Sequence, residues 1–359
     1  MADFSAYDGP SAEWLALAAT LPPPPLGLSI PELKEATNAG RDAASAAAMQ
    51  TLSPQVTTQD HSIPTRDGAA IEARTYRRAV ETASSPSPVP VYIHLHGGGF
   101  LFGTLSSEDP ACARVAVTTG ALILNVNYRH TPEHAYPTAW DDVEDAFAWL
   151  HANAAALGAD PAQVVVGGIS AGAYLTASLA LRKHLGLVPA LGGLPAIKGL
   201  VLMIPALVHI DCYAPVLGKL KDVAISSFET CKDAPVLPRK VCRLFMDLLK
   251  VKEVQGLDEA DVRLNPGNAT PEQVKGLPPT AFGVAGYDPL RDEGLLFAQM
   301  LTEAGVPTDV NLFNGVPHGF RRYGDQLSEC ERWDRVVERG IEWALGGPKA
   351  TGVFEIKTE

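Results

Sequence analysis

The stretch AQVVVGGISAGAYLT, residues Ala162–Thr176, decides the fold of this chain. A valine-rich run leads into the pattern Gly168-Ile169-Ser170-Ala171-Gly172, and an Ala/Leu-rich run follows it. A strand that turns sharply into a helix leaves no room for side chains beside the central residue, so glycines are needed on both sides. Ser170 is then predicted to lie on a tight bend, with its hydroxyl exposed at the positive end of a helix. Because 32 glycines make such a pattern common by chance, an ordinary turn is the alternative.

A second glycine-rich segment lies upstream of this pattern. Val89–Leu95 is predicted to be a strand, and His96, Gly97, Gly98 and Gly99 follow it directly. Successive glycines after a strand let the backbone turn several N–H groups toward one point. In hydrolases with a strand–G-x-S-x-G–helix plan, such groups help to bind the oxyanion. A flexible loop is the better interpretation of these residues in isolation, but not together with the serine pattern.

Two further side chains follow later strands. Asp288 comes after the predicted strand Thr280–Ala285, and His318 comes after the predicted strand Thr308–Phe313. The order Ser, acid, His along the chain is the one expected for this type of sheet. A serine hydroxyl is too weakly acidic to attack a carbonyl group unless an imidazole takes its proton, and a carboxylate must orient that imidazole. We therefore predict that Ser170, His318 and Asp288 act together.

Each of these assignments has an alternative. Asp288 could simply cap the predicted helix Arg291–Ala304, and His318 could be an ordinary surface-loop residue. Asp292 is a rival acid, although it falls inside that helix. His130 and His134 flank Glu133 and suggest a metal site, but no further ligands lie nearby in the sequence, so a structural turn is the better interpretation. No metal and no organic cofactor is predicted.

Strands that alternate with helices predict a mostly parallel twisted sheet with helices on both faces. An antiparallel hairpin, Val56–Ile63 and Ala70–Tyr76, is predicted at its start because Asp67-Gly68 is a turn signal. Thr138 with Asp141 is expected to cap a helix. The Ser/Pro-rich stretch 81–88 is predicted to be a loop. The stretch between the strands Lys198–Pro205 and Thr280–Ala285 is too long for a crossover, so it contains an insertion.

Apolar helical faces occur in this insertion and near the N-terminus, which suggests that both form a cap over the sheet. The insertion has one such face at Leu237, Val241, Leu244, Phe245 and Leu248. Near the N-terminus, a Ser29–Glu32 capping box precedes an Ala-rich helix, and a proline run at 22–25 separates it from a short helix in which Trp14, Leu15 and Leu17 are expected to be buried. The chain is thus divided into an N-terminal cap segment (1–50), a first part of the core (51–205), a cap insertion (206–275) and a second part of the core (276–359).

Composition narrows the range of partners and compartments. With 29 basic and 41 acidic residues the net charge is −12, which disfavours nucleic acid as a partner. Five scattered cysteines favour reduced thiols over a disulfide framework. The start of the sequence lacks the pattern of a secretion signal, and no apolar run reaches membrane-spanning length. A cytoplasmic protein without a membrane span is expected, and a homodimer is compatible with the sequence.

Taken together, these motifs resemble the hormone-sensitive-lipase-like carboxylesterases of the α/β-hydrolase fold, which include arylacetamide-deacetylase-like enzymes. The resemblance spans residues 55–345 and rests on His96-Gly97-Gly98-Gly99, Tyr128-Arg129 with Pro132-Glu133-His134, Asp160-Pro161, Gly168-Ile169-Ser170-Ala171-Gly172, Asp288-Pro289-Leu290-Arg291-Asp292-Glu293 and His318-Gly319-Phe320. The chain departs from the family pattern at Ile169, where Asp or Thr is usual, and at Ala173, where a further glycine is common. The first departure removes a polar group beside the site.

The resemblance implies a function as well as a fold. It implies Ser170 as nucleophile, His318 as base and Asp288 as its orienting partner, with the backbone N–H groups of Gly98, Gly99 and Ala171 as oxyanion donors. The expected substrate is a small ester with a short- to medium-chain or aryl group. Two alternatives share the same motifs. One is an acyltransferase, or a hydrolase of thioesters, lactones or amides, because the acyl-enzyme half-reaction is common to all. The other is a non-catalytic receptor for a small molecule.

Overall fold

The computed structural model of the chain describes residues 1–22, 27–79 and 87–359. Its centre is a sheet in the order β1-β2-β4-β3-β5-β6-β7-β8-β9. The pairs β1–β2 and β2–β4 are antiparallel, and all the others are parallel. The strands are β1 (Val56–Pro64), β2 (Ala70–Arg78), β3 (Val89–Leu95), β4 (Leu122–Asn127), β5 (Ala159–Ile169), β6 (Gly199–Met203), β7 (Thr280–Tyr287), β8 (Thr308–Pro317) and β9 (Ile356–Lys357).

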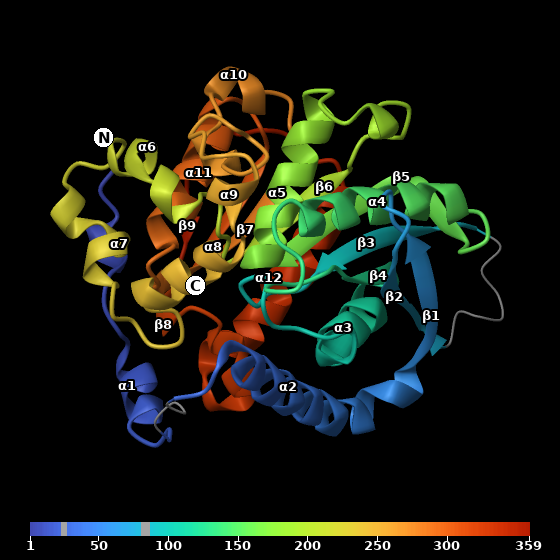
Figure 1. Cartoon of the computed structure of the whole chain (residues 1–359), viewed down its shortest axis with the longest axis horizontal. Helices are drawn as coiled ribbons and strands as arrows, with labels where there is room; N and C mark the ends of the chain where they lie inside the picture. Colours follow the sequence, from blue (N-terminus) through green and yellow to red (C-terminus); the bar gives the residue numbers. More distant parts are fainter. Residues whose placement is uncertain (23–26, 80–86) are drawn as a thin grey trace.

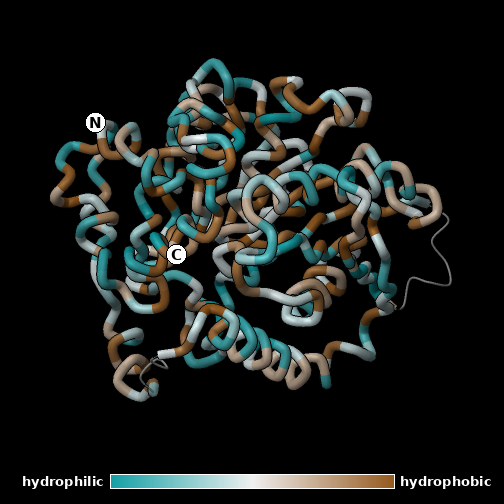
Figure 2. Tube along the Cα trace, viewed as in Figure 1, coloured by the Kyte–Doolittle hydropathy of each residue, from teal (hydrophilic) through white to brown (hydrophobic). Residues whose placement is uncertain are grey.

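Helices cover both faces of this sheet, as predicted (Figure 1). One face carries α3 (Asp109–Thr119) and α12 (Ser328–Leu345), with α2 (Ile30–Leu52) packed outside α3. The other face carries α4 (Thr138–Asn153), α5 (Ala171–His184) and α11 (Arg291–Glu303). Successive side chains of β5 point to opposite faces of the sheet, so this strand contributes to the hydrophobic core on both faces. Val164 and Val166 lie in one core cluster and Val165 lies in the other. Figure 2 shows the hydrophobic residues concentrated along these central strands.

The chain between β6 and β7 forms short helices instead of a single crossover. It contains α6 (Ala214–Leu217), α7 (Ser227–Thr230), α8 (Arg239–Leu248), α9 (Val251–Val254) and α10 (Pro271–Val274), with short 3-10 turns at Ile210–Cys212, Val223–Ile225 and Pro266–Asn268. Four of the five residues of the predicted apolar face lie on α8, where Phe245 is buried and Val241 and Leu248 pack against the same cluster. The fifth, Leu237, precedes the helix and is buried in that cluster. Further 3-10 turns lie at Ser106–Glu108, Pro189–Leu191 and Phe320–Gln326.

The N-terminal region agrees with its prediction except at one position. It comprises a 3-10 turn at Ser5–Tyr7, α1 (Ala12–Ala18), α2 with the predicted Ser29–Glu32 capping box, and a 3-10 turn at Ser53–Gln55. Trp14 and Leu17 are buried, but Leu15 is 55% exposed. Positions 14 and 17 share a helix face, whereas position 15 points away from it, so only two of the three side chains reach the core.

The predicted cap of α4 is wrong: Thr138 is the first helical residue, Pro137 occupies the cap position, and no side chain bonds there. The Asp141 carboxylate instead accepts hydrogen bonds from Arg66 and Arg263. These charged groups attract it more strongly than a backbone N–H at the start of the helix would. Most of the predicted loop at 81–88, and most of the proline run at 22–25, lie outside the described residues.

Candidate active site

The serine pattern forms the sharp strand-to-helix turn that its glycines predict. β5 ends at Ile169 and α5 begins at Ala171, which leaves Ser170 between them with φ 54° and ψ −112°. A Cβ on Gly168 would lie 2.2 Å from the carbonyl carbon of Gly172, and a Cβ on Gly172 would lie 2.0 Å from the carbonyl oxygen of Leu95. Both glycines are therefore required by close backbone packing. A positive φ at a serine is a strained conformation, which the surrounding structure maintains.

The three predicted side chains meet at this turn. His318 Nε2 lies 2.8 Å from Ser170 Oγ, and His318 Nδ1 lies 2.7 Å from Asp288 Oδ2. The Leu290 N–H donates to the other Asp288 oxygen at 2.9 Å, which fixes the carboxylate. An ionised carboxylate only accepts hydrogen bonds, so Nδ1 of the imidazole carries the proton and Nε2 is free to accept the hydroxyl proton. All three side chains are buried.

The rival acid is used elsewhere. Asp292 Oδ1 accepts from Arg291 Nε at 2.8 Å, and its Oδ2 accepts from the Ser227 N–H at 2.8 Å. Arg291 is fully buried and also contacts Asp8 Oδ1 at 3.3 Å. Asp292 therefore anchors the insertion to α11, and its neighbour Arg291 anchors the N-terminal segment there, whereas Asp288 faces the imidazole.

The glycine loop after β3 lies beside Ser170. Gly99 and Ala171 both border the same pocket as Ser170. Ala171 is the first residue of α5, so its N–H has no acceptor within that helix. Gly98 forms the turn behind them, with φ 140°, and its carbonyl accepts from the N–H groups of Leu101 and Phe102. The glycine loop and the N-terminus of α5 thus border the same pocket as Ser170.

A buried polar network holds this loop in place. The Tyr128 hydroxyl donates to the carbonyl oxygen of His96 at 2.7 Å, and Arg41 of α2 donates to that of Gly97 at 3.1 Å. Nε2 of His130 lies 3.1 Å from Nε2 of His96. Burial lowers the pKa of His96 to about 4 and also lowers that of His130, so both rings are neutral, and one nitrogen donates while the other accepts.

The suspected metal cluster is a structural turn. Glu133 forms an ion pair with Lys34 of α2 at 2.5 Å, while the partner of His130 is a ring nitrogen of His96. Within residues 1–22, 27–79 and 87–359, no group of three or more His, Cys, Asp or Glu side chains is arranged to hold a metal ion. None of the helices in these ranges combines the length and apolar character needed to cross a membrane.

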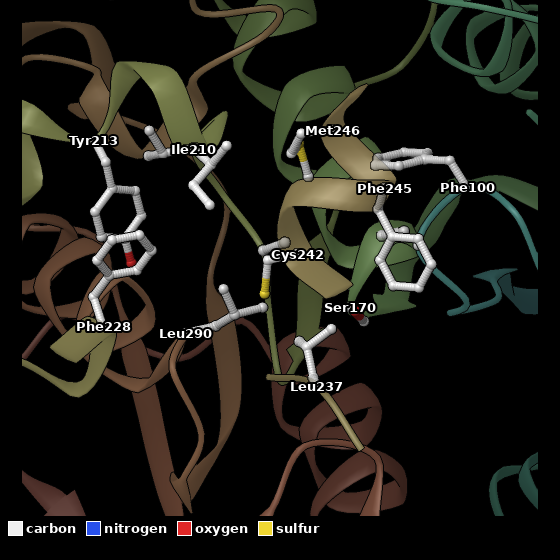
Figure 3. A pocket seen from close by; sticks show the side chains of 14 residues that line it. Phe100, Ser170, Ile210, Tyr213, Phe228, Leu237, Cys242, Phe245, Met246 and Leu290 are labelled. Atoms are coloured by element: carbon white, nitrogen blue, oxygen red, sulfur yellow. The ribbon is translucent and has the colours of Figure 1, made fainter. Parts of the chain in front are cut away.

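A narrow pocket opens onto Ser170 (Figure 3). Its free volume is about 30 Å³, space for roughly two water molecules. The lining is almost entirely apolar, and most of it comes from the segment between β6 and β7. The lining residues are Gly99, Phe100, Ser170, Ala171, Ala206, Val208, Ile210, Tyr213, Phe228, Leu237, Cys242, Phe245, Met246 and Leu290.

One buried carboxyl group near this pocket was missed by the sequence analysis. Glu293 of α11 is 2% exposed, and its Oε1 accepts from the Leu207 N–H at 2.7 Å. Burial raises its pKa to about 8, and the nearby Asp288 carboxylate acts in the same direction. The signal in the sequence was an acidic residue two positions before the apolar run Leu295–Ala298, within the quoted Asp288–Glu293 motif, but nothing there indicated that the side chain points inward.

Comparison with known proteins agrees with this architecture. The model of the α/β-hydrolase-fold family matches residues 92–322. Carboxylesterase NlhH from Mycobacterium tuberculosis is 36% identical over 230 residues, which are 63% of this chain and 64% of that relative. The chain thus matches somewhat less than two thirds of the length of this relative.

Two solved structures extend the likeness to nearly the whole chain. A vibralactone cyclase has a TM-score of 0.82 at 26% identity, covering 96% of this chain and 97% of its own. A bacterial heroin esterase has a TM-score of 0.76 at 29% identity, covering 95% and 99% respectively. The family match, the sheet order and the turn at the serine lead to one conclusion: this chain belongs to the α/β-hydrolase-fold family, in its hormone-sensitive-lipase-like carboxylesterase branch.

Proposed function

We propose that this protein hydrolyses carboxylic esters of small molecules through an acyl-enzyme formed on Ser170. The observation that carries this proposal is the continuous contact from Ser170 Oγ to His318 Nε2 (2.8 Å) and from His318 Nδ1 to Asp288 Oδ2 (2.7 Å). The esterase names of the similar proteins support it. The chemistry needs neither a metal ion nor an organic cofactor.

The first half-reaction transfers the acyl group to the enzyme. His318 Nε2 takes the proton of the Ser170 hydroxyl as Oγ attacks the carbonyl carbon. The carbonyl oxygen becomes an oxyanion, which accepts hydrogen bonds from the N–H groups of Gly98, Gly99 and Ala171. His318 then gives the proton to the departing alcohol oxygen, and the bond between that oxygen and the acyl carbon breaks.

The second half-reaction repeats these steps with water. His318 takes a proton from a water molecule, whose oxygen attacks the acyl carbon, and Ser170 leaves with the proton returned to its oxygen. Asp288 holds the imidazole in the tautomer that accepts at Nε2 and stabilises its charged form in both halves. Because Leu290 N–H fixes the second carboxylate oxygen, Asp288 can do this without reorienting.

We further propose that residues 1–50 and 206–275 form a cap on a core made of 51–205 and 276–359. Most of the side chains that line the pocket come from residues 206–275, which supports this division. Contacts of α2 with the glycine loop, such as Arg41 with Gly97, support a role for the N-terminal segment. The five cysteines are all buried and free, which supports a reducing compartment such as the cytoplasm.

A second candidate is transfer of the acyl group to a hydroxyl other than water. The similarity to a vibralactone cyclase over 96% of this chain supports this second candidate. The narrow apolar pocket supports it as well, because it limits the access of water to Ser170. In this reaction an alcohol oxygen replaces water as the attacking group, and an ester or lactone is released. A non-catalytic receptor is disfavoured, because such a protein has no need for an imidazole 2.8 Å from the serine hydroxyl.

The test is turnover of a short-chain aryl ester by the full chain and by Ser170→Ala. We expect the variant to lose activity by at least about 10⁴-fold, because no other group can form the acyl-enzyme. Ser178→Ala is the matched control, since Ser178 lies on the same helix and donates to the Arg263 carbonyl outside the pocket. Comparable turnover by wild type and Ser170→Ala would refute the proposal. Product analysis with and without added alcohols separates hydrolysis from transfer.

A further inference from the structure

One face of α2 forms hydrogen bonds with the loop that carries the proposed oxyanion donors. Asn38, Arg41 and Ser45 share this face, because they follow one another at spacings of three and four residues. Asn38 Oδ1 accepts from the Gly103 N–H at 2.9 Å, and the Ser45 hydroxyl donates to the carbonyl oxygen of Ser106 at 2.6 Å. These two contacts lie beyond the glycines, whereas Arg41 reaches the glycines themselves.

The contact of Arg41 is with the carbonyl oxygen of Gly97, to which its Nη1 donates at 3.1 Å. The guanidinium also lies over the Phe102 ring, 5.9 Å from the ring centroid, which favours this position of the side chain. His96 Nδ1 lies 3.1 Å from the same oxygen and is a donor there, because a carbonyl oxygen only accepts. Two donors therefore hold the Gly97 carbonyl group, and Arg41 is the charged one.

The Gly97 carbonyl and the Gly98 N–H belong to one peptide group. This group is trans and planar, so its C=O and its N–H point in opposite directions. A peptide group between two glycines rotates at little cost unless it is anchored, because neither residue has a Cβ. By holding the oxygen, Arg41 therefore sets the direction of the Gly98 N–H, which is one of the three proposed oxyanion donors.

The charge of Arg41 acts through the same peptide group. A cation bonded to the carbonyl oxygen polarises the group, and its N–H becomes a stronger donor. The gain is largest when the acceptor carries a full negative charge, as the oxyanion does, and smaller for the neutral carbonyl oxygen of a bound ester. Arg41 does not line the pocket that opens onto Ser170. It is thus placed to lower the reaction barrier without contributing to substrate binding.

We propose that Arg41 is a positioning residue for ester hydrolysis, which orients and polarises the Gly97–Gly98 peptide group so that the Gly98 N–H binds the oxyanion. This inference rests on the proposed esterase function and gives α2, a helix of the N-terminal segment, a role in the chemical step. Arg41 acts through Gly97 and does not contact the substrate.

The experiment measures hydrolysis of 4-nitrophenyl acetate and inhibition by an aryl trifluoromethyl ketone, both on the full chain. Ser170 Oγ adds to the carbonyl carbon of the ketone, the hydroxyl proton passes to His318, and the carbonyl oxygen becomes an oxyanion. The inhibition constant Ki therefore reports oxyanion binding without turnover.

Three variants separate the charge of Arg41 from the packing of α2. Arg41→Met removes the charge and the donor but keeps an apolar stem beside Phe102. Arg41→Lys keeps a cationic donor, which can replace the single bond from Nη1. Ser45→Ala is the control, because it removes a contact of the same helix face with Ser106 and leaves the Gly97 carbonyl untouched.

We expect Arg41→Met to lower kcat and kcat/KM equally, by about tenfold to a hundredfold, and to raise Ki by the same factor. The loss is smaller than that of a whole donor because His96 still holds the oxygen. Arg41→Lys should stay within about threefold of wild type, and Ser45→Ala should lower the melting temperature while kcat and Ki stay unchanged. If Arg41→Met does not fold, Arg41→Gln, which is also uncharged, takes its place with the same expectation.

The inference would be overturned by a kcat or Ki of the uncharged variant within about twofold of wild type, or by a rise in KM as large as the fall in kcat. An equal loss in Ser45→Ala, or an Arg41→Lys as impaired as the uncharged variant, would overturn it as well. Failure of the proposed function is distinguishable, since wild type itself would then not hydrolyse the ester.

Discussion

The ring of Phe245 packs directly on the backbone of Gly99. A Cβ added to Gly99 would lie 2.2 Å from a carbon of that ring, so the contact exists only because the residue is a glycine. Phe245 belongs to α8 in the segment between β6 and β7, whereas Gly99 belongs to the loop after β3. The insertion thus contacts the glycine loop at the pocket itself, and Phe245 limits the space beside Ser170.

Replacement of Phe245 should therefore change substrate size preference. Phe245→Ala removes most of the side chain that narrows the pocket, so we expect the ratio of kcat/KM for an octanoate to that for an acetate aryl ester to rise about tenfold or more. The gain reflects extra methylenes that can be buried, each worth about 0.8 kcal/mol. Leu244→Ala is the control, because Leu244 lies on the same helix but does not line the pocket. An unchanged ratio in Phe245→Ala would contradict this assignment.

The glycine loop gives a second prediction. Gly99→Ala places a Cβ into the Phe245 ring at a residue with φ 62°, so the loop must move away from Ser170. We expect kcat to fall by about 10²–10³, the cost of losing one oxyanion donor. Gly305→Ala controls for the positive φ alone, since a Cβ there would have no atom within 4 Å. Equal loss of kcat in both variants would show that the loop geometry is not responsible.

Replacement of Asp288 and replacement of Asp292 should have different effects on kcat. Asp288→Asn leaves His318 without a carboxylate to set its tautomer, and we expect kcat to drop by about 10⁴ with the fold retained. Asp292→Asn weakens the contacts with Arg291 and Ser227 instead, so its main effect should be a lower melting temperature with kcat per folded molecule nearly unchanged. The reverse pattern would make Asp292 the orienting acid.

Glu293 should make stability depend on pH. Its pKa is raised to about 8 in the folded chain, against about 4.3 in an unfolded one. Between these values the unfolded state is ionised while the native state keeps its proton, so the free energy of unfolding falls as pH rises from about 5 to about 8 and levels off above that. The slope from this group is at most about 1.4 kcal/mol per pH unit.

The matched variant for this effect is Glu293→Gln, which cannot ionise and retains an acceptor for the Leu207 N–H. Its stability relative to wild type, measured by urea unfolding, should increase steadily over the same pH range. A stability difference that does not depend on pH between 5 and 8 would show that Glu293 is already ionised in the native state.

The fold and the contact of Ser170 with His318 and Asp288 were predictable because local patterns encode them. Gly168 and Gly172 are required by backbone contacts that any strand-to-helix turn of this type makes, and Asp288 and His318 follow directly on strands whose apolar runs are visible in the sequence. The parallel sheet then brings the ends of these strands together, so their chain order was enough to predict the meeting of Ser170, Asp288 and His318.

Features that depend on how distant segments pack could not be predicted. The inward direction of Glu293, the contact of Phe245 with Gly99 and the pairing of His96 with His130 each join elements far apart in the chain. The exposure of Leu15 could not be predicted for the same reason, since it depends on which face of the short helix α1 packs against the rest of the protein. The cap of α4 was mispredicted because the charged partners of Asp141 come from other elements.

The most direct test of the central claim is covalent labelling of the full chain with a fluorophosphonate, followed by peptide mass spectrometry. A serine activated by His318 attacks the phosphorus and expels fluoride, so we predict one adduct on the peptide that contains Ser170, and no adduct in Ser170→Ala or after denaturation. Labelling at another serine, or an unlabelled wild-type chain that still hydrolyses aryl esters, would contradict the account.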